Sequence, residues 1–336
     1  MDLKNNNIRL QWGVKVTEGK GNQYGYFVHN TELRKAVEKQ IKLVDENPTD
    51  ILYITGPEFF KGKVKGVRTW LFTMFEGTTV PKKYQEQMIK ADVLLAPSTW
   101  VADMFKKYFD IPIYVVPHGV NNKYRYKKKR MPVNRPFRFL WVGAPNPRKG
   151  YEEIMVVWNE LFKGRKDMLL WIKSTGPSEW SYNDKVVQRS NVVLDGRRLP
   201  LNALIKMYQG ADVFLFPTRG EGFGLTLAEA MKCGLPCIAP AYSGVTDFFD
   251  DKVGYTIDYK IGKGKVTFIG DKHSEETGMA FPDVEDLAKK IMYVVSNYKE
   301  AIKKGKRAAQ RMKTYTWYRS ASLLIKALKE VNDANL

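Results

Sequence analysis

The feature that most constrains the fold is the alternation of short apolar runs with segments that carry helical apolar spacing. The apolar runs lack regular polar alternation, which is typical of parallel strands buried on both faces. Helical spacing occurs at 31–44 and 99–108, with Thr31 and Ser98 as candidate N-caps. This order of signals predicts an α/β protein with parallel sheets. The predicted strands are 51–55, 69–73, 93–96, 113–116, 137–142, 168–172, 192–194, 213–216 and 237–239.

The chain of 336 residues is long enough for two such domains. Between Pro117 and Pro136, Pro, Gly and Asn residues and a basic run make poor material for a core. We therefore predict two Rossmann-like domains that face a central cleft, because such folds bind ligands beyond the carboxyl ends of their strands. The predicted boundaries are 1–120 for the N-terminal domain, 121–136 for a basic linker, 137–312 for the C-terminal domain, and 313–336 for a terminal helix that packs back towards the N-terminal domain.

Composition argues against several other classes of protein. A hydrophobic content of 44% is that of a globular chain. No apolar run approaches the roughly 20 residues that span a bilayer, and the first residues lack the apolar stretch of a secretory signal, so we expect a cytoplasmic protein. Cys233 and Cys237 are the only cysteines and lack a second pair of ligands, so we expect no metal site.

The net charge of +19 is large for a chain of this size. Such an excess suggests a polyanionic partner, either nucleic acid or an acidic membrane surface. A well-solvated surface that repels other copies of the chain is the alternative, and the charge alone does not choose between them.

The segment 213–240 carries the strongest chemical signal. A buried strand is followed by a Gly-rich turn and by a helix that is predicted to begin near Leu225. Gly222 and Gly224 let the backbone approach a ligand and leave free N–H groups at the helix start. Glu221 in the turn and Glu229 in the helix can face one cleft, where carboxylates would accept hydroxyl hydrogen bonds. We expect this turn to be exposed; taken singly, each glutamate is more often a solvated surface charge.

The joint pattern from Glu221 to Ala239 resembles the E-x7-E motif of retaining GT-B glycosyltransferases, specifically the large group 4 family. The resemblance implies the GT-B fold, a nucleotide-sugar donor, retention of anomeric configuration and no metal or other cofactor. Further segments that look like the family are 91–98, 115–120, 211–218 and 242–247.

The resemblance also assigns roles to residues of the motif. Glu221 would hold hydroxyls of the donor sugar, and Glu229 would hold the ribose. The donor would also contact the backbone at Phe223 and Gly224, with Gly222 and Leu225 beside it.

The family places a basic pair on the donor diphosphate in a loop that corresponds to 143–150. Lys149 matches this pattern, but Ala144 stands where the family has arginine. We infer that Arg148 supplies the missing charge, since a departing diphosphate needs compensating cations. An exposed basic dipeptide is the alternative. Gly21 belongs to a Gly-rich loop that the family directs at the diphosphate.

Two further loops are expected at the site. Gly196 and Arg197 follow a predicted strand where the family binds the nucleotide base, which we expect to be that of UDP or GDP. Glu76 follows another strand on the acceptor side and could orient the acceptor hydroxyl or take its proton. The simpler interpretation is that Glu76 or Thr78 caps the next helix.

The acceptor is the least determined element. Basic residues that could bind a polyanion occur in two clusters, and in one of them they alternate with tyrosines, a combination that suits a phosphate backbone with exposed bases. We infer nucleic acid as the acceptor, for example a hydroxymethylated base in DNA. The residues of the two clusters are Lys61, Lys63, Lys65, Arg68, Lys127 and Lys128.

Other functions stay open. A peripheral enzyme could dock its basic segment 303–313 on an anionic membrane and glycosylate a lipid or a growing glycan. Transfer to a protein or a small molecule would leave the charge incidental. A nucleotide-sugar-binding protein without turnover, or a nucleotide-sugar epimerase of the same fold, finds less support because both glutamates stand at the transferase spacing.

Overall fold

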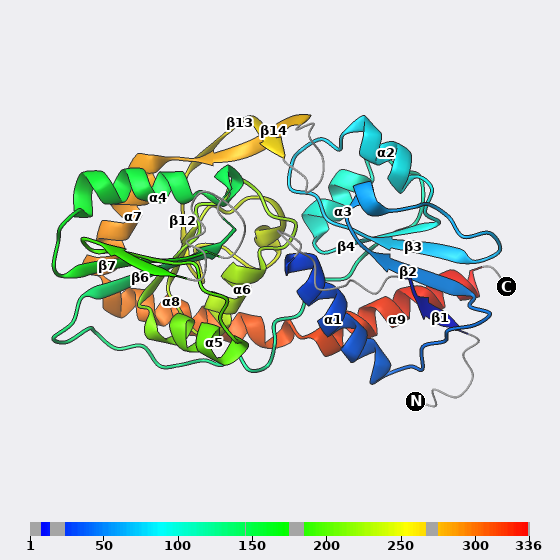
Figure 1. Cartoon of the computed structure of the whole chain (residues 1–336), viewed down its shortest axis with the longest axis horizontal. Coiled ribbons are helices and arrows are strands. Elements are labelled where there is room, and N and C mark those ends of the chain that lie inside the picture. Colours follow the sequence, from blue (N-terminus) through cyan, green and yellow to red (C-terminus); the bar gives the residue numbers. More distant parts are fainter. Residues whose placement is uncertain (1–7, 14–23, 145, 175–184, 267–274, 335–336) are drawn as a thin grey trace.

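The computed structural model describes residues 8–13, 24–144, 146–174, 185–266 and 275–334. It contains two largely parallel sheets, and helices cover both faces of each (Figure 1). The predicted α/β class with two parallel-sheet domains is thereby confirmed. We call the unit built on the five-stranded sheet the first domain and the unit built on the seven-stranded sheet the second domain.

The first domain has the strand order β1-β2-β3-β4-β5, and every pair is parallel. Alternate residues of one strand enter two different cores, because side chains alternate across a sheet. Val93 and Leu95 of β4 pack with α1, whereas Leu94 and Ala96 pack with α2 and α3. The elements are β1 (Leu10–Trp12), α1 (Tyr24–Glu38), β2 (Asp50–Ile54), β3 (Arg68–Phe72), α2 (Lys82–Met88), β4 (Val93–Ala96), α3 (Thr99–Phe105) and β5 (Ile113–Val115).

The second domain has the strand order β12-β11-β10-β6-β7-β9-β8, in which only the β8–β9 pair is antiparallel. Phe139 and Trp141 of β6 enter the core under α4 and α7, and Leu140 and Val142 enter the core under α5 and α6. The elements are β6 (Phe137–Gly143), α4 (Tyr151–Val157), β7 (Met168–Ser174), β8 (Val186–Arg189), β9 (Val192–Asp195), α5 (Leu201–Gly210), β10 (Val213–Leu215), α6 (Leu225–Lys232), β11 (Cys237–Ala239), β12 (Tyr255–Thr256), α7 (Val284–Ser296) and α8 (Tyr298–Arg311).

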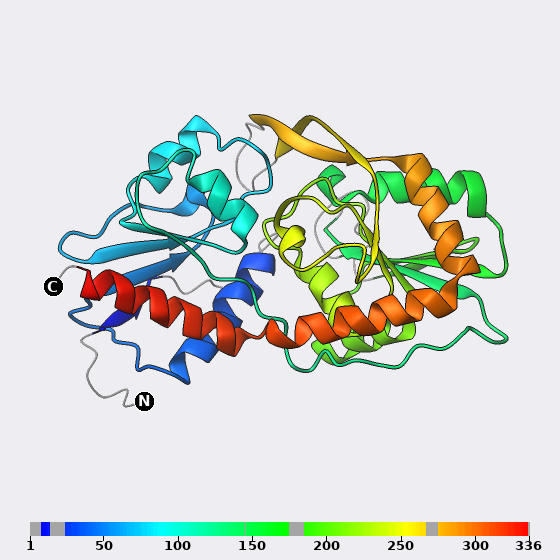
Figure 2. The same cartoon turned by 180° about the vertical axis from the view of Figure 1, so that it is seen from behind.

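The last helix, α9 (Trp317–Asp333), returns to the first domain (Figure 2). Its Leu324 and Leu328 are fully buried in the same core as Trp70 of β3. The returning chain passes the outgoing chain so closely that a Cβ on Gly119 would lie 2.1 Å from the backbone nitrogen of Trp317. Glycine is therefore required where the two connections cross.

A two-stranded antiparallel hairpin, β13 (Tyr259–Val266) and β14 (Glu275–Pro282), joins the domains at a second place. It extends from the second domain to the turn after β3 (Figure 1). Gly278 accepts a hydrogen bond from the Thr78 N–H at 3.1 Å, and Met279 is buried in a core of the first domain. The sequence analysis did not predict this hairpin.

Helix starts were predicted with mixed success. Ser98 caps α3, because its hydroxyl accepts the Val101 N–H at 3.3 Å, as predicted. Thr31 as an N-cap is wrong: α1 begins at Tyr24, and Thr31 lies inside it. The helix starts earlier than the spacing suggested because Tyr26 and Val28 also pack against the sheet.

Ser98 has a second contact, since its hydroxyl donates to the carbonyl of Gly222 in the other domain at 2.8 Å. We expect Ser98→Ala to destabilise the protein by about 2–3 kcal/mol, because it removes a helix cap and leaves a buried carbonyl without its donor. The measurement is urea unfolding followed by fluorescence. Thr316→Ala is the control: Thr316 caps α9 through the Arg319 N–H alone and should cost about 1 kcal/mol. Equal losses in the two variants would contradict a role of Ser98 between the domains.

Candidate active site

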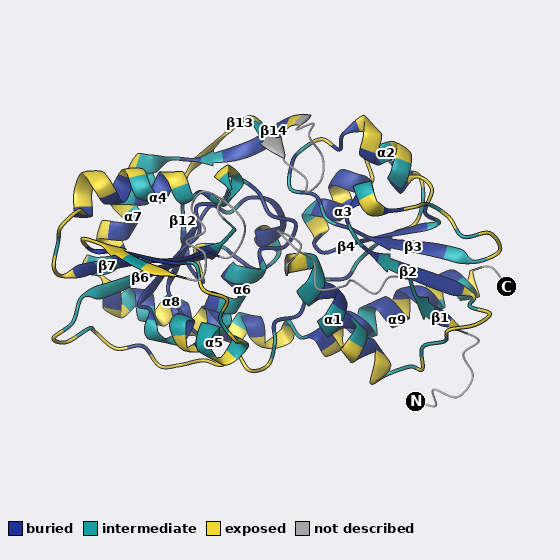
Figure 3. Ribbon diagram, in the orientation of Figure 1, coloured by how far each residue is buried: buried dark blue, intermediate teal, exposed yellow. Residues whose placement is uncertain are grey.

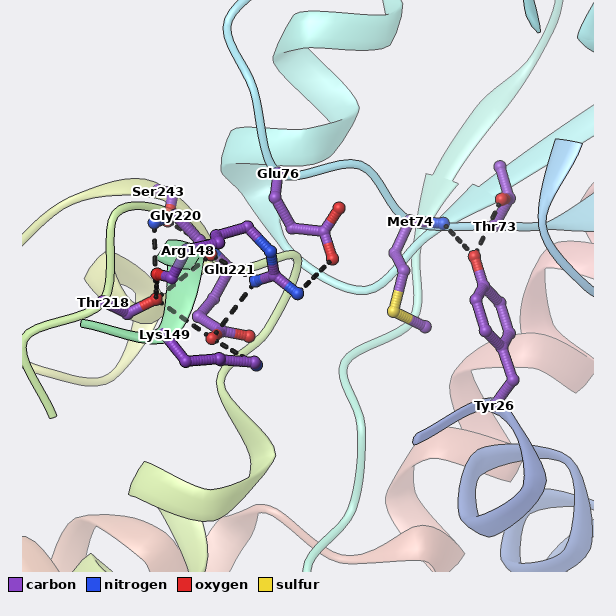
Figure 4. A network of polar contacts seen from close by, with 10 residues as sticks. All are labelled: Tyr26, Thr73, Met74, Glu76, Arg148, Lys149, Thr218, Gly220, Glu221 and Ser243. Carbon is purple, nitrogen blue, oxygen red and sulfur yellow. Dashed lines mark hydrogen bonds and ion pairs between the residues drawn. The ribbon is translucent and has the colours of Figure 1, made fainter. Parts of the chain in front are cut away.

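The site forms where loops after parallel strands of the two domains meet. Glu76 follows β3 of the first domain. Arg148 and Lys149 follow β6 of the second domain, and Glu221 follows β10. These side chains converge in Figure 4. The meeting of carboxyl strand ends is where an α/β fold places a ligand.

Glu221 is the centre of a network of polar contacts. Its Oε1 lies 2.5 Å from Lys149 Nζ and 3.3 Å from Arg148 Nη1. The Thr218 hydroxyl donates to the same oxygen at 3.1 Å. Burial would raise the pKa of the Glu221 carboxyl, but Lys149 and Arg148 outweigh that effect and the pKa is lowered. Glu221 is therefore a carboxylate at neutral pH.

The turn that carries Glu221 is buried, in contrast to our expectation of an exposed turn. Glu221 is 6% exposed, and the loops around it are coloured as buried in Figure 3. Its N–H donates to the Ser243 hydroxyl at 2.8 Å, and its carbonyl accepts the Gly244 N–H at 2.9 Å. The segment after β11 therefore fixes the turn. Sequence reasoning did not single out Ser243, although its segment 242–247 was noted.

Arg148 also contacts the first domain. Its Nη1 donates to the Gly220 carbonyl at 2.6 Å, and its Nη2 lies 3.2 Å from Glu76 Oε1. The two side chains of this pair are 15% and 14% exposed. The predicted alternative for Arg148 and Lys149, an exposed basic dipeptide, is therefore wrong. One guanidinium joins carboxylates from both domains.

The glycines of the turn serve contact between the domains. A Cβ on Gly220 would lie 2.4 Å from the Glu76 carbonyl oxygen, and a Cβ on Gly222 would lie 2.8 Å from Met74 Cβ. Gly224 has φ +91°, a conformation that favours glycine, and it precedes the first residue of α6. Two of the three glycines are thus explained by the approach of the first domain.

The neighbouring motif residues differ in what they leave available to a ligand. The Phe223 side chain is buried against His118 and Phe248, so only its backbone can contact a ligand. Leu225 begins α6 and is half-buried. Gly21 lies outside the described residues.

Glu229 lies apart from the cations, within the second domain. Its Oε2 accepts a hydrogen bond from the Tyr208 hydroxyl at 3.0 Å. Burial raises the pKa of Glu229 to about 7, although hydrogen bonds from Tyr208 and Tyr124 oppose the increase. The two glutamates of the motif therefore differ in protonation: Glu221 is ionised, and Glu229 titrates near neutrality.

The loop of Gly196 and Arg197 lies at the carboxyl end of β9. Arg197 is exposed and forms two hydrogen bonds with Asp195, at 3.0 and 2.7 Å. Beneath it, the buried Lys173 donates to the backbone carbonyls of Ser174, Asp195 and Arg197. Lys173 and Asp195 thus fix the shape of this loop. Sequence reasoning missed both, and the only signal was a charged residue at the end of each apolar strand.

The structure does not bring the predicted polyanion-binding residues to this site. Lys61, Lys63 and Lys65 precede β3, whereas the site lies beyond its other end. Arg68 pairs with the buried Asp50 at 3.2 Å and donates to Asn332 of α9 at 2.8 Å, so its charge is used inside the protein. Binding of a polyanion by Arg68 stays a prediction.

Lys127 and Lys128 are exposed in the connection to β6. They line a surface hollow of about 510 Å³ together with Arg130 and Arg138. Between them and Arg130, the buried Lys129 donates to backbone carbonyls at the end of α5. This hollow lies at the amino ends of β6 and β10, on the side opposite to Arg148 and Glu221.

Two other kinds of feature are absent from the described ranges. No group of three or more His, Cys, Asp or Glu side chains there could hold a metal ion. No helix in the same ranges combines the length and apolar character needed to cross a membrane.

Comparison with known proteins places this geometry in context. Residues 136–297 match the family model described as glycosyl transferases group 1. A putative glycosyltransferase from Acidianus filamentous virus 1 is 28% identical over 217 residues, which are 61% of this chain and 61% of that protein. In a second relative, a probable sucrose-phosphate synthase from Thermosipho melanesiensis, the matched segment covers 42% of the length of the protein. The chain thus matches less than two thirds of the length of either relative.

Solved structures share the architecture of both domains. A sucrose-phosphate synthase from Thermosynechococcus elongatus superposes with a TM-score of 0.62 at 16% identity, over 93% of this chain and 80% of that one. A pneumococcal O-GlcNAc transferase in complex with UDP and GlcNAc has a TM-score of 0.55 at 17% identity, over 84% of this chain and 56% of that one. The chain therefore has the GT-B fold, and its residues 136–297 are similar to the glycosyl transferases group 1 family.

Proposed function

We propose that the protein is a retaining glycosyltransferase, a hexosyl- or pentosyltransferase that moves a sugar from a nucleoside-diphosphate sugar to an acceptor hydroxyl. The observation that carries this proposal is the network in which Arg148 and Lys149 meet Glu221 between the domains. Two buried cations can compensate the negative charge that develops on a departing diphosphate. They supply the charge that a metal ion would otherwise provide, so we propose metal-independent transfer.

The remaining residues receive roles from their positions. Glu221 accepts hydrogen bonds from hydroxyls of the donor sugar, since its carboxylate lies beside both cations. Glu229 accepts hydrogen bonds from the ribose hydroxyls. The backbone of Phe223 and Gly224, between the two glutamates in sequence, contacts the donor. The loop of Gly196 and Arg197 contacts the base. UDP or GDP is the proposed nucleotide, and the UDP complex of one structural neighbour supports the former.

In the proposed step, the bond between the anomeric carbon and the diphosphate oxygen breaks and the bonding electrons remain on the phosphate. The acceptor hydroxyl oxygen forms its bond to the same face of the anomeric carbon. Its proton passes to the leaving phosphate oxygen or to Glu76, which lies on the first-domain side of Arg148. Both cations stabilise the released nucleoside diphosphate.

For the acceptor we propose nucleic acid, with a hydroxymethylated DNA base as the specific candidate. The support is the net charge of +19 and the exposed Lys61, Lys65, Lys127 and Lys128. These cations lie away from Arg148 and Glu221, so they would hold the backbone of a long polymer outside the site. Such an enzyme would work in the cytoplasm.

A membrane-bound acceptor is the competing proposal. Lys303 and Lys306 are exposed on α8, but the apolar side of this helix packs into the second domain and presents no apolar stripe to a lipid surface.

We expect Glu221→Gln to lower kcat/KM by at least about 100-fold, because the variant keeps the shape of the side chain but loses the charge between the two cations. The measurement is release of nucleoside diphosphate. The control is Glu152→Gln, which removes an exposed carboxylate of α4 that pairs only with Arg219 and should leave the rate unchanged. Full activity of a folded Glu221→Gln protein would refute the site assignment.

Nucleotide affinity should depend on pH through Glu229. Ribose hydroxyls donate to the ionised carboxylate, while the raised pKa of about 7 keeps part of it protonated at neutral pH. Binding below pH 7 must therefore release a proton, and the affinity should rise by up to about tenfold per pH unit up to pH 7 and then level off. Calorimetric titration from pH 5.5 to 8.5 measures this rise. The same titration of Glu229→Gln is the control, because ionisation of the nucleotide affects both proteins equally. If the affinity of the two proteins changes with pH in the same way, Glu229 does not bind the ribose.

Donor and acceptor are tested together by measuring nucleoside diphosphate release from UDP-, GDP-, ADP- and TDP-sugars. Each is incubated alone, with duplex DNA that carries hydroxymethylated pyrimidines, or with anionic vesicles that contain lipid-linked sugars. We expect one donor to be used and the modified DNA to stimulate release, with unmodified DNA as the control. Stimulation by the vesicles alone would reject the nucleic-acid acceptor and keep the transferase. No release from any donor would reject the transferase.

A further inference from the structure

Glu76 holds the side of Arg148 that faces the first domain. The guanidinium has Glu221 on Nη1 and Glu76 on Nη2, at 3.3 and 3.2 Å (Figure 4). Glu76 and Arg148 come from different domains, and both side chains are largely buried. In the described structure, Glu76 thus occupies one of the places where an anionic ligand would contact this cation.

The charges of the network already balance without a ligand. Arg148 and Lys149 carry two positive charges, and Glu76 and Glu221 carry two negative charges. A diphosphate brings at least two more negative charges to the same cations. In a site shielded from water, like charges at this range repel strongly. At least one of the two carboxylates must therefore give up its present contacts when a diphosphate binds.

The backbone around Glu76 is fixed on both sides. The Met74 N–H donates to the Tyr26 hydroxyl of α1 at 3.3 Å. Beyond Glu76, Thr78 exchanges two hydrogen bonds with Gly278 of the hairpin, each of 3.1 Å. A Cβ on Gly77 would lie 2.2 Å from the Thr277 hydroxyl oxygen, so this turn is packed against β14. Release of Arg148 therefore comes from rotation of a side chain of this pair and not from movement of the loop that carries Glu76.

We propose that Glu76 competes with the donor diphosphate for Arg148. This inference rests on the proposed function of the site. The diphosphate takes the guanidinium, and the displaced carboxylate becomes free to receive the acceptor hydroxyl on the first-domain side. Glu221 keeps its place because its backbone and side chain are both held within the second domain.

The consequence is an order of binding: the acceptor hydroxyl finds a free carboxylate only after the donor has bound. One side chain weakens donor binding and then assists transfer. Its removal should thus change affinity and turnover in opposite directions, which loss of a purely structural contact would not do.

The test is calorimetric titration of UDP, GDP, ADP and TDP into the wild type and Glu76→Gln. We expect the variant to bind the preferred nucleotide about threefold to tenfold more tightly, since an anion has been removed from the cation that the diphosphate needs. The control is Glu86→Gln, which removes an exposed carboxylate of α2 in the same domain and should leave the affinity unchanged. Thermal unfolding verifies that each variant is folded.

A second comparison isolates the residue through which Glu76 acts. In an Arg148→Gln background, the further change Glu76→Gln should give no gain in affinity, because the shared cation is gone. With the natural donor, Glu76→Gln should lower both KM for the donor and kcat.

The outcomes separate the two proposals. Equal or weaker nucleotide binding by Glu76→Gln, while the wild type binds normally, overturns the competition and leaves the proposed function intact. The same gain in Glu86→Gln also overturns it, because the effect would then be one of overall charge. Failure of both the wild type and Glu76→Gln to bind any of the four nucleotides overturns the proposed function and this inference with it.

Discussion

Arg148 and Lys149 place two positive charges between the domains, and such charges persist in a protein interior only where carboxylates meet them. Glu76 and Glu221 meet them from opposite domains. This pairing requires loops of the two domains to approach each other closely, which in turn requires glycine at 220 and 222. The charge pairing, the small residues and the relative position of the two sheets therefore depend on one another, and a change in one of them strains the others.

Much of the fold could be predicted from the sequence because buried parallel strands leave a local signal. The runs 93–96 and 139–142 are apolar without interruption, and both strands are covered on two faces. The hairpin β13–β14 left no such signal, because Lys and Gly alternate in its first strand and its inward face is covered by residues almost 200 positions away, such as Thr79. The start of α1 was misplaced because Thr31 has the character of a cap but lies inside the helix.

The site was predictable to the extent that its residues belong to local sequence patterns: Glu221 stands in one pattern, and Lys149 stands in another that lies 72 positions before it. Arg148, Lys149 and Glu221 lie together in the structure, although their roles stay a proposal. Contacts made between distant segments could not be read from spacing. The Ser243 hydroxyl supports Glu221 across 22 positions, and Glu76 reaches Arg148 from the other domain. The basic clusters show a different limit: Lys61, Lys63 and Lys65 precede β3, at the end away from the site, and their binding of a polyanion stays a prediction.

The return of α9 to the first domain has a consequence for how the chain is made. A ribosome completes residues 24–116 long before it reaches Trp317, yet Trp70 and Phe72 bury one face under Leu324 and Leu328 of that last helix. The first sheet therefore leaves the ribosome with an uncovered apolar surface while the second domain, whose strands and covering helices are contiguous in sequence, can already close its cores. In this chain the segment that is synthesised first completes its core last.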